Sequence, residues 1–144
     1  MRRANICILA GFLVLSGISS PPSQAAQGKA GVVTLTEAEI LIYFLPEALQ
    51  VRADGMDVGW EEDSTPANNQ KDYYYFFVYN AKRPAETANV TIGHFAVNKH
   101  TADVWDAITF EAVSSKEISG IQRILRRAHR IDQKTIERYR SVVF

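Results

Sequence analysis

The sequence lacks several features on which whole classes of protein depend. Its 144 residues include one cysteine, Cys7, which lies in an apolar N-terminal stretch. If that stretch is removed, the remaining chain has no thiol, so disulfides and cysteine metal ligands are excluded and the core alone must hold the fold. No later apolar run approaches the ~20 residues that a membrane-spanning helix requires.

Motifs of the common enzyme classes are also missing. The chain has no phosphate-binding loop, no G-x-G-x-x-G and no G-x-S-x-G sequence. Its three histidines, His94, His100 and His129, do not have the spacing of a zinc site. We therefore expect no metal, no cofactor and no catalytic residue, which favours a binding protein over an enzyme.

The first 25 residues have the pattern of a secretory signal peptide. Two arginines precede an apolar core from Ile6 to Val14, and small residues follow it. This pattern predicts cleavage before Ala26 and a mature protein of about 119 residues in the periplasm or outside the cell, with 26–33 as a short tether. A retained N-terminal anchor is the alternative.

The charges balance over the chain, at 16 basic and 16 acidic residues, but they are segregated. Nine acids and two bases lie between Glu37 and Asp72, whereas seven bases and two acids lie between Arg123 and Arg140. Two solvated faces that offset each other account for this pattern. The sharper interpretation is a C-terminal surface that contacts an anionic membrane surface or an acidic partner protein, since an exported protein is not expected to bind nucleic acid. The predicted anion-facing residues are Arg123, Arg126, Arg127 and Arg130.

Capping signals predict helices at both ends of the chain. Two overlapping Thr-x-x-Glu boxes at 34–39 precede an apolar stripe, so we expect a helix over 36–49 that kinks or restarts at Pro46. A further capping box begins at Ser114, and Asp132 is placed to cap a last helix. The apolar stripe of that last helix is Ile136, Tyr139 and Val143.

Four strands are expected between the helices. They cover 51–62, 72–80, 89–97 and 102–109, and the last two are joined by a turn at 98–101. The order of elements predicts a single α+β domain over 34–144, in which an N-terminal helix packs on an antiparallel sheet and one or two helices follow.

Alternation along the strands assigns side chains to faces. Tyr73, Tyr75 and Tyr79 share one side of the aromatic strand, which we expect to be the wetter side because tyrosine keeps a polar tip. On the next strand, Ile92 and His94 are expected to share a face. The predicted core residues are Phe76, Val78, Phe95 and Trp105.

The segment from Phe95 to Trp105 resembles the closing hairpin of PepSY-like domains. That hairpin has an Asp/Asn-x-x-Thr-Gly turn, to which Asn98 and Thr101 correspond here, and Ala102 stands at the glycine position. The resemblance covers residues 34–107 and implies a cystatin-like fold, with a curved sheet packed on a helix. PepSY-like domains are exported and non-catalytic, and they are often described as protease-inhibitory or regulatory. The resemblance therefore implies an exported, non-catalytic protein.

Two functional hypotheses follow. The first is an exported binding or inhibitory protein of the bacterial envelope that blocks a peptidase, a cell-wall hydrolase or a toxin of that kind, with aromatic side chains at the contact. Its predicted contact residues are Tyr73, Tyr75, Tyr79, Asn98, Lys99 and His100.

The second hypothesis is a cystatin-like domain that binds a small ligand or acts as an enzyme through a cavity between helix and sheet. Its polar candidates are His94, Asp103 and Tyr79. The position of His94 distinguishes the two hypotheses, because the cavity requires this side chain to point between the helix and the sheet.

Overall fold

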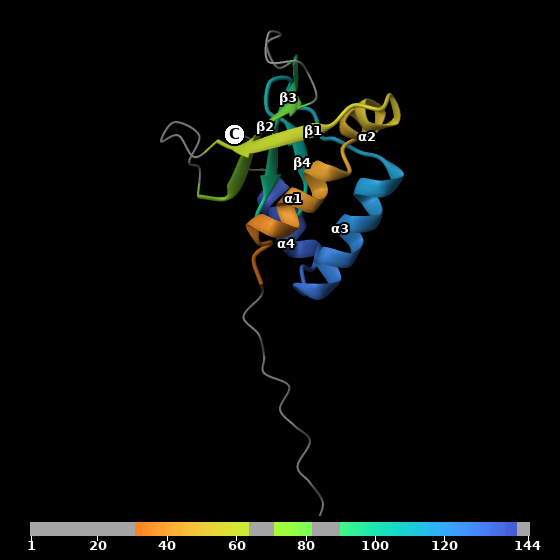
Figure 1. Ribbon diagram of the computed structural model, residues 1–144. Helices are drawn as coiled ribbons and strands as arrows, with labels where there is room; N and C mark the ends of the chain where they lie inside the picture. Colours follow the sequence, from red (N-terminus) through yellow and green to blue (C-terminus); the bar gives the residue numbers. More distant parts are fainter. Residues whose placement is uncertain (1–30, 64–70, 82–89, 141–144) are drawn as a thin grey trace, which may run out of the picture.

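The computed structural model describes residues 31–63, 71–81 and 90–140. One antiparallel sheet in these segments has the strand order β1-β2-β3-β4, so the expected α+β class and its four-stranded sheet are confirmed (Figure 1). The elements are α1 (Leu35–Tyr43), α2 (Pro46–Ala53), β1 (Val58–Glu62), β2 (Tyr73–Asn80), β3 (Val90–Asn98), β4 (Val104–Asp106), α3 (Lys116–Ala128) and α4 (Gln133–Arg140).

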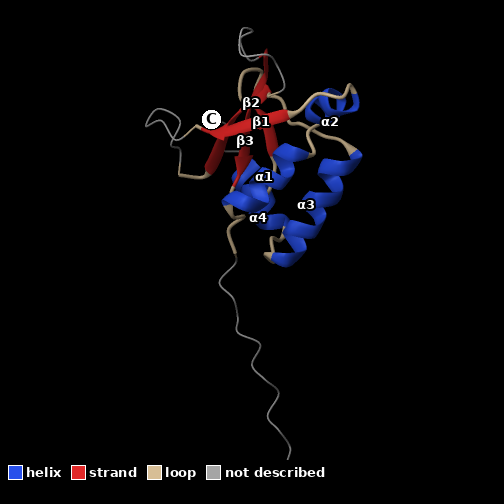
Figure 2. Cartoon of the chain, viewed as in Figure 1, coloured by secondary structure: helices blue, strands red, loops and turns tan. Residues whose placement is uncertain are grey.

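The helices α1 and α3 form a layer on one face of the sheet (Figure 2). α1 packs on β2 and β3 and against α3, while α2 packs on β1. α4 lies at the end of the sheet where β3 turns into β4, because Tyr139 of α4 stacks on His100 of that turn. None of the helices in the described segments is long and apolar enough to span a membrane.

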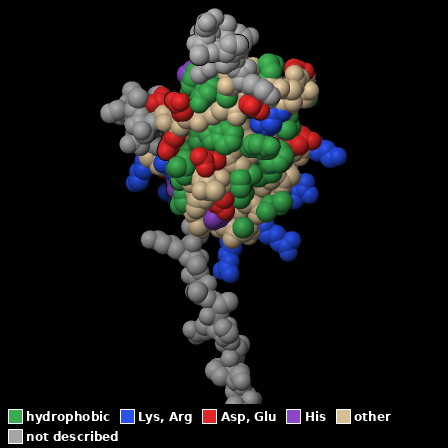
Figure 3. Space-filling model, in the orientation of Figure 1, with side chains coloured by type: hydrophobic (Ala, Val, Ile, Leu, Met, Phe, Trp, Pro, Cys, Tyr) green, Lys and Arg blue, Asp and Glu red, His purple; other side chains and the backbone are tan. Residues whose placement is uncertain are grey.

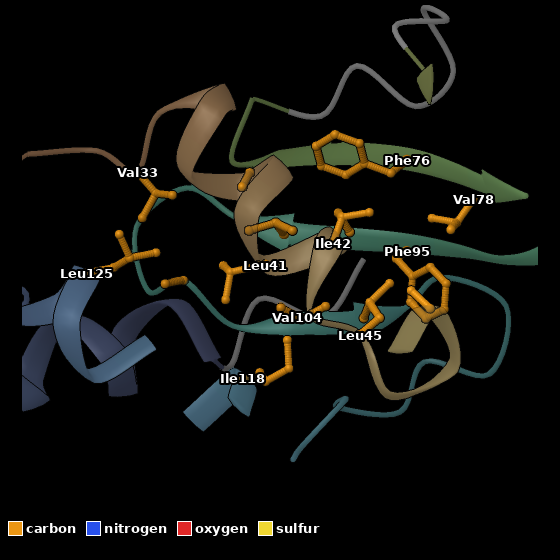
Figure 4. Close-up of a cluster of buried hydrophobic side chains, with 14 residues drawn as sticks. Val33, Leu41, Ile42, Leu45, Phe76, Val78, Phe95, Val104, Ile118 and Leu125 are labelled. Atoms are coloured by element: carbon orange, nitrogen blue, oxygen red, sulfur yellow. The ribbon is translucent and has the colours of Figure 1, made fainter. Parts of the chain in front are cut away.

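An apolar core fills the space between the helix layer and the sheet (Figure 4). The predictions of Phe76, Val78 and Phe95 as core residues are confirmed, since each is at most 2% exposed. The prediction of Trp105 is wrong, because Val104 points into the core and adjacent strand residues point to opposite faces. The helices contribute Leu41, Ile42 and Ile118, and Leu45, the residue before α2, also belongs to the core.

The break predicted at Pro46 separates two helices. Pro46 is the first residue of α2, where its missing N–H leaves no hydrogen bond unmade. α2 therefore continues to Ala53, through residues expected to begin the first strand, and β1 starts only at Val58. The expected strand over 51–62 is wrong in its first half.

The strand β4 is shorter than the predicted 102–109. The Asp106 Oδ1 atom accepts hydrogen bonds from the N–H groups of Ile108 and Thr109, each at 2.8 Å. A side chain that captures nearby N–H groups in this way diverts them from the ladder. The chain turns and returns beside β4, where Ala112 forms a bridge with Trp105.

Side-chain caps set the starts of α1 and α3. Thr34 and Glu37 form the predicted reciprocal capping box at α1. At α3 the cap is Ser115 instead of Ser114, because the Ile118 N–H donates to the Ser115 hydroxyl at 3.1 Å. Ser114 fits the capping-box pattern because Glu117 follows three residues later, whereas Ser115 has Ile118 at that position and caps the helix through its hydroxyl alone.

The start of α4 agrees with the sequence. The Thr135 N–H donates to the Asp132 carboxylate at 2.8 Å, as expected of an N-cap. Ile136 is buried and Tyr139 is half-buried, so both belong to the inward stripe of the helix. The third predicted member, Val143, lies outside the described residues.

The chain before α1 belongs to the domain. Val33 is fully buried, and its N–H donates to the Lys99 carbonyl at 2.8 Å. The Tyr74 hydroxyl donates to the Val33 carbonyl at 3.2 Å. The predicted tether therefore ends inside the fold, and the residues before Gly31, including the predicted signal peptide 1–25, lie outside the described residues.

Glu37 connects α1 to the end of α3. The His129 Nε2 atom lies 2.8 Å from its carboxylate. Burial opposes the charge on Glu37, but hydrogen bonds from the Thr34 N–H, from His129 and from the Thr34 hydroxyl outweigh it, so the pKa of Glu37 falls below its ordinary value of 4.5. The fold therefore favours the ionised carboxylate.

α3 ends in a Schellman motif that has an arginine at its left-handed position. The Ile131 N–H donates to the Arg126 carbonyl at 2.8 Å, and the Arg130 N–H donates to the Arg127 carbonyl at 3.3 Å. Arg130 has a φ of 55°. Glycine is usual at this position because a Cβ there costs about 1–2 kcal/mol.

Replacing Arg130 by Gly is expected to raise the free energy of unfolding by about 0.5–1 kcal/mol, because relief at the left-handed position exceeds the entropy that glycine adds to the unfolded chain. Urea denaturation measures the change. Arg127→Gly, within the last helical turn, is the matched control and should lower stability by about 1 kcal/mol. Destabilisation by both variants would contradict the assignment.

Replacing Glu37 by Gln is expected to lower the free energy of unfolding near pH 7 by about 1 kcal/mol, because the capping and His129 contacts lose their charge. A carboxylate whose folded pKa is depressed contributes stability above its unfolded pKa and loses it as the pH falls through the folded value. The difference between the two proteins should therefore shrink from pH 7 to about pH 3. A constant difference in urea titrations at both pH values would disprove this linkage.

Candidate functional site: the outer face of the sheet

The face of the sheet opposite α1 and α3 carries a row of aromatic side chains. The strand register opposes Tyr75 to Ala96 and Ala96 to Trp105, and it opposes Phe77 to His94. The predicted alternation along β2 is confirmed, so Tyr79 continues the row on the same face. We call this surface the outer sheet face. Its residues are Tyr75, Phe77, Tyr79, His94 and Trp105.

The rings on this face pack against one another along β2. Phe77 and Tyr79 stack with their centroids 5.5 Å apart and their planes at 28°, and Phe77 contacts His94 at 5.1 Å. Tyr75, Phe77 and Tyr79 are half-buried, and His94 is exposed. The face is therefore a fixed aromatic surface that is partly open to solvent, a composition that is enriched at protein interfaces.

A bulge in β3 decides which of its side chains share this face. Val78 opposes Gly93 and Tyr79 opposes Thr91, so Ile92 is the extra residue. Ile92 packs against the core, whereas His94 lies on the outer sheet face. The expectation that these two residues share a face is wrong because strict alternation does not hold across the bulge.

The position of His94 contradicts the predicted cavity. His94 is exposed on the outer sheet face, while Phe76 and Phe95 fill the space between α1 and the sheet. Of the other polar candidates, Tyr79 lies on the outer face and Asp103 lies in the turn before β4. The arrangement that the small-ligand or enzymatic hypothesis requires is therefore absent from the described residues.

The turn that was expected to contact a partner is partly structural. The Asn98 side chain is 2% exposed, and its Oδ1 atom accepts hydrogen bonds from the N–H groups of His100 and Thr101 at 2.8 and 3.1 Å. Ala102, at the glycine position of the PepSY-like pattern, has a φ of 60°. Asn98 thus stabilises the turn, and its prediction as a contact residue is wrong.

Tyr73 is also unavailable for contact. It lies on the predicted side of β2 but is only 4% exposed, at the end of the strand where it lies opposite Asn98, beside the turn. Burial raises the pKa of its hydroxyl above the ordinary 10.0. The prediction of Tyr73 as a contact residue is wrong, while Tyr75 and Tyr79 remain accessible in part.

Lys99 and His100 lie at the surface at this end of the sheet. The Lys99 ammonium sits 4.5 Å from the centroid of the Tyr74 ring. The His100 Nε2 atom lies 2.8 Å from the Asp72 carboxylate, and its ring stacks on Tyr139 at 4.0 Å. Both side chains are half-buried and held in place, and their contact role stays a prediction.

Two further residues, Phe77 and Glu61, lie beside the predicted contact residues. Phe77 lies between Tyr75 and Tyr79, and alternation alone would have included it in the row. Glu61 of β1 lies opposite Phe77, and its carboxylate accepts a hydrogen bond from the Tyr79 hydroxyl at 3.4 Å. Strand register brings Glu61 here, and no local sequence signal reports it.

The four arginines predicted to attract anions do not act together. The Arg126 guanidinium donates to the Thr101 carbonyl at 2.8 Å and lies 2.7 Å from the Asp103 carboxylate. Arg126 therefore has an internal partner, and its prediction as an anion-facing residue is wrong. The other three are exposed, and basic side chains project around the α3 side in Figure 3, so membrane contact stays a prediction for Arg123, Arg127 and Arg130.

Asp103 is the charge that joins α3 to the sheet. The residue is 9% exposed, and its N–H donates to the Thr101 hydroxyl at 3.2 Å. Its carboxylate bonds Arg126 and also lies 3.9 Å from a guanidinium nitrogen of Arg140 in α4. Asp103 therefore holds two helices against the turn between β3 and β4.

Comparisons with known proteins find no matching family model and no matching curated protein. Among solved structures, the chain is similar to a chain in a type VI secretion system effector-immunity complex from Pseudomonas protegens. The identity is 18% and the TM-score is 0.54, over 81% of this chain and 92% of that one. At this identity the similarity shows a shared fold. The PepSY-like resemblance stays a prediction.

Replacing Arg126 by Leu is expected to lower the free energy of unfolding by about 2–4 kcal/mol, because it leaves the Asp103 carboxylate buried beside a distant second cation. Arg123→Leu, at an exposed position of the same helix, should change stability by less than about 0.5 kcal/mol. Chemical denaturation of both variants measures the difference. Equal effects would show that the Arg126 pair contributes nothing specific.

Proposed function

We propose that this chain is an exported, non-catalytic protein that binds and inhibits a secreted effector, in the manner of an immunity protein. The composition of the outer sheet face is the main observation that supports this proposal. It presents stacked aromatic side chains in fixed positions, while α1 and α3 occupy the opposite face. Such a surface loses little side-chain entropy on binding and gains large contact area, which is what protein interfaces favour.

The structural comparison supports a protein partner. The similar chain belongs to an effector-immunity complex, so a chain of this fold takes part in an effector-immunity pair in that case. The signal-peptide pattern of the first 25 residues supports action in the periplasm or outside the cell. A peptidase or a cell-wall hydrolase is the class of effector that acts there.

The arrangement of the surface suggests how inhibition would occur. Tyr75 and Tyr79 offer ring faces with polar tips, and Lys99 and His100 stand at one end of the same sheet. Tyrosine at the centre and charged groups at the edge is the usual order of an interface, with apolar contacts supplying affinity and charges supplying orientation. The inhibitor would thus block its target by covering it, without a reaction of its own.

The test is growth rescue of cells that export a toxic peptidase, amidase or lysozyme-type hydrolase to the periplasm. Co-production of the full chain should neutralise one of these enzymes. Combining Tyr79→Ala with Lys99→Ala should weaken the affinity for that purified enzyme at least about tenfold, because aromatic truncations at interfaces commonly cost more than 1 kcal/mol.

Ile124→Ala is the control for this test, because Ile124 is 68% exposed on α3 in the helix layer. This variant should protect as well as the wild type, and unchanged thermal unfolding should show that all variants fold. Rescue from none of the enzymes, or equal affinity of the double variant and the wild type, would refute the proposal.

A further inference from the structure

We propose that Glu61, Phe77 and Tyr79 form a subsite for an arginine side chain of the protein partner. The identity of the partner rests on the proposed function, but the chemistry of the subsite can be tested without it. The subsite combines a flat aromatic pair and a carboxylate at its edge, which are the two groups that a guanidinium binds at once.

The three side chains meet across the ladder between β1 and β2. Glu61 lies directly opposite Phe77 in the register, and the Tyr79 hydroxyl donates to the Glu61 Oε1 atom at 3.4 Å. Phe77 and Tyr79 stack with their planes at 28°. The hydrogen bond is long and uses one of the two carboxylate oxygens, so Glu61 keeps capacity to accept from a ligand.

A glycine allows the Tyr79 ring to take this position. A Cβ atom at Gly59, which lies opposite Tyr79 in the register, would come within 2.7 Å of the ring. The absence of a side chain at Gly59 therefore lets the ring lie across β1 and bring its hydroxyl to Glu61. Two residues of the short edge strand thus shape the same subsite.

The Glu61 carboxylate has no cationic partner among the described residues. Asp72, Asp103 and Glu37 each have a cationic or histidine partner within 4.0 Å, whereas Glu61 has none there. Glu62 follows Glu61 along the exposed edge strand and adds a further negative charge. An exposed carboxylate of this kind attracts a cation from outside the chain.

Arginine fits this geometry better than lysine does. A guanidinium is planar, so it stacks on a ring and forms paired hydrogen bonds with a carboxylate in the same plane, whereas an ammonium is a point charge. The chain itself contains both kinds of contact, a guanidinium over an aromatic ring and a guanidinium bonded to a carboxylate. The Arg52 guanidinium lies 3.8 Å from the centroid of the Tyr43 ring, and Arg126 bonds Asp103 at 2.7 Å.

The test is an NMR titration of the exported protein, purified from the periplasm of the cells that express it. The probes are N-acetyl-arginine methylamide and the citrulline analogue, which keeps the planar shape and loses the charge. The arginine probe should shift the signals of Glu61, Phe77 and Tyr79 saturably, with a dissociation constant of about 1–50 mM, and citrulline should bind about tenfold more weakly.

Two variants show whether the carboxylate carries the effect. Glu61→Gln should reduce arginine binding to the citrulline level, because it removes the charge and keeps the shape. Glu47→Gln, at an exposed acid on α2, should leave the titration unchanged. Tyr79→Phe keeps the ring and should retain most of the arginine affinity, which also shows that the strand remains folded.

Three outcomes of the NMR titration would overturn the proposal. These are equal binding of arginine and citrulline, undiminished binding by Glu61→Gln, and stronger shifts of the same signals by N-acetylglucosamine, which would make the aromatic pair a sugar site. Neutralisation of an effector that persists in Glu61→Gln would remove the subsite and leave the proposed function intact. Saturable arginine binding by a chain that protects against no effector would refute the proposed function and leave the subsite intact.

Discussion

The structure depends on a single strand, β2, whose two faces are both apolar. Side chains alternate across a strand, so the continuous aromatic run in β2 must place large rings on both sides of the sheet. Phe76 and Val78 are covered by the helix layer and become core. The rings of Phe77 and Tyr79 point to the other side, where α1 and α3 do not reach, and they remain half open to solvent. The accessible aromatic surface is thus a direct consequence of the strand that also supplies Phe76 and Val78 to the core.

Two ionic contacts connect the helices to one another and to the turn between β3 and β4. Asp103 bonds Arg126 of α3, and Glu37 of α1 bonds His129 at the end of α3. Both pairs connect residues that are far apart in the chain, and both lie toward the same end of the sheet, near the turn before β4. Each pair stabilises the fold only while both of its members are present, because a single desolvated charge is unfavourable. Each pair therefore also specifies how the helices sit on the sheet. The opposite end of the helix layer is held by apolar packing.

These two features lie on opposite sides of the sheet. The helix layer supplies the core and the ionic contacts, while the outer sheet face carries half-buried aromatic rings and, at its edge, the exposed Glu61 carboxylate. Two residues of the edge strand β1 position Tyr79. Gly59 leaves room for its ring, and the Glu61 carboxylate accepts a hydrogen bond from its hydroxyl. A partner that brings a planar cation to this corner would complete contacts that the chain leaves open, and it would do so without any change in the core.

The sequence by itself determined the features that arise within a few residues. The capping box at Thr34, the helix restart at Pro46 and the alternation along β2 all depend on neighbours in the chain, and the structure agrees with each. Tertiary structure alone decided where His94 points, because a bulge shifts the alternation of β3, and it alone made Arg126 a partner of a buried carboxylate 23 residues away. Local patterns report the conformation that a segment prefers. Burial and pairing depend on which distant segment arrives beside it, and only the packed fold supplies that information.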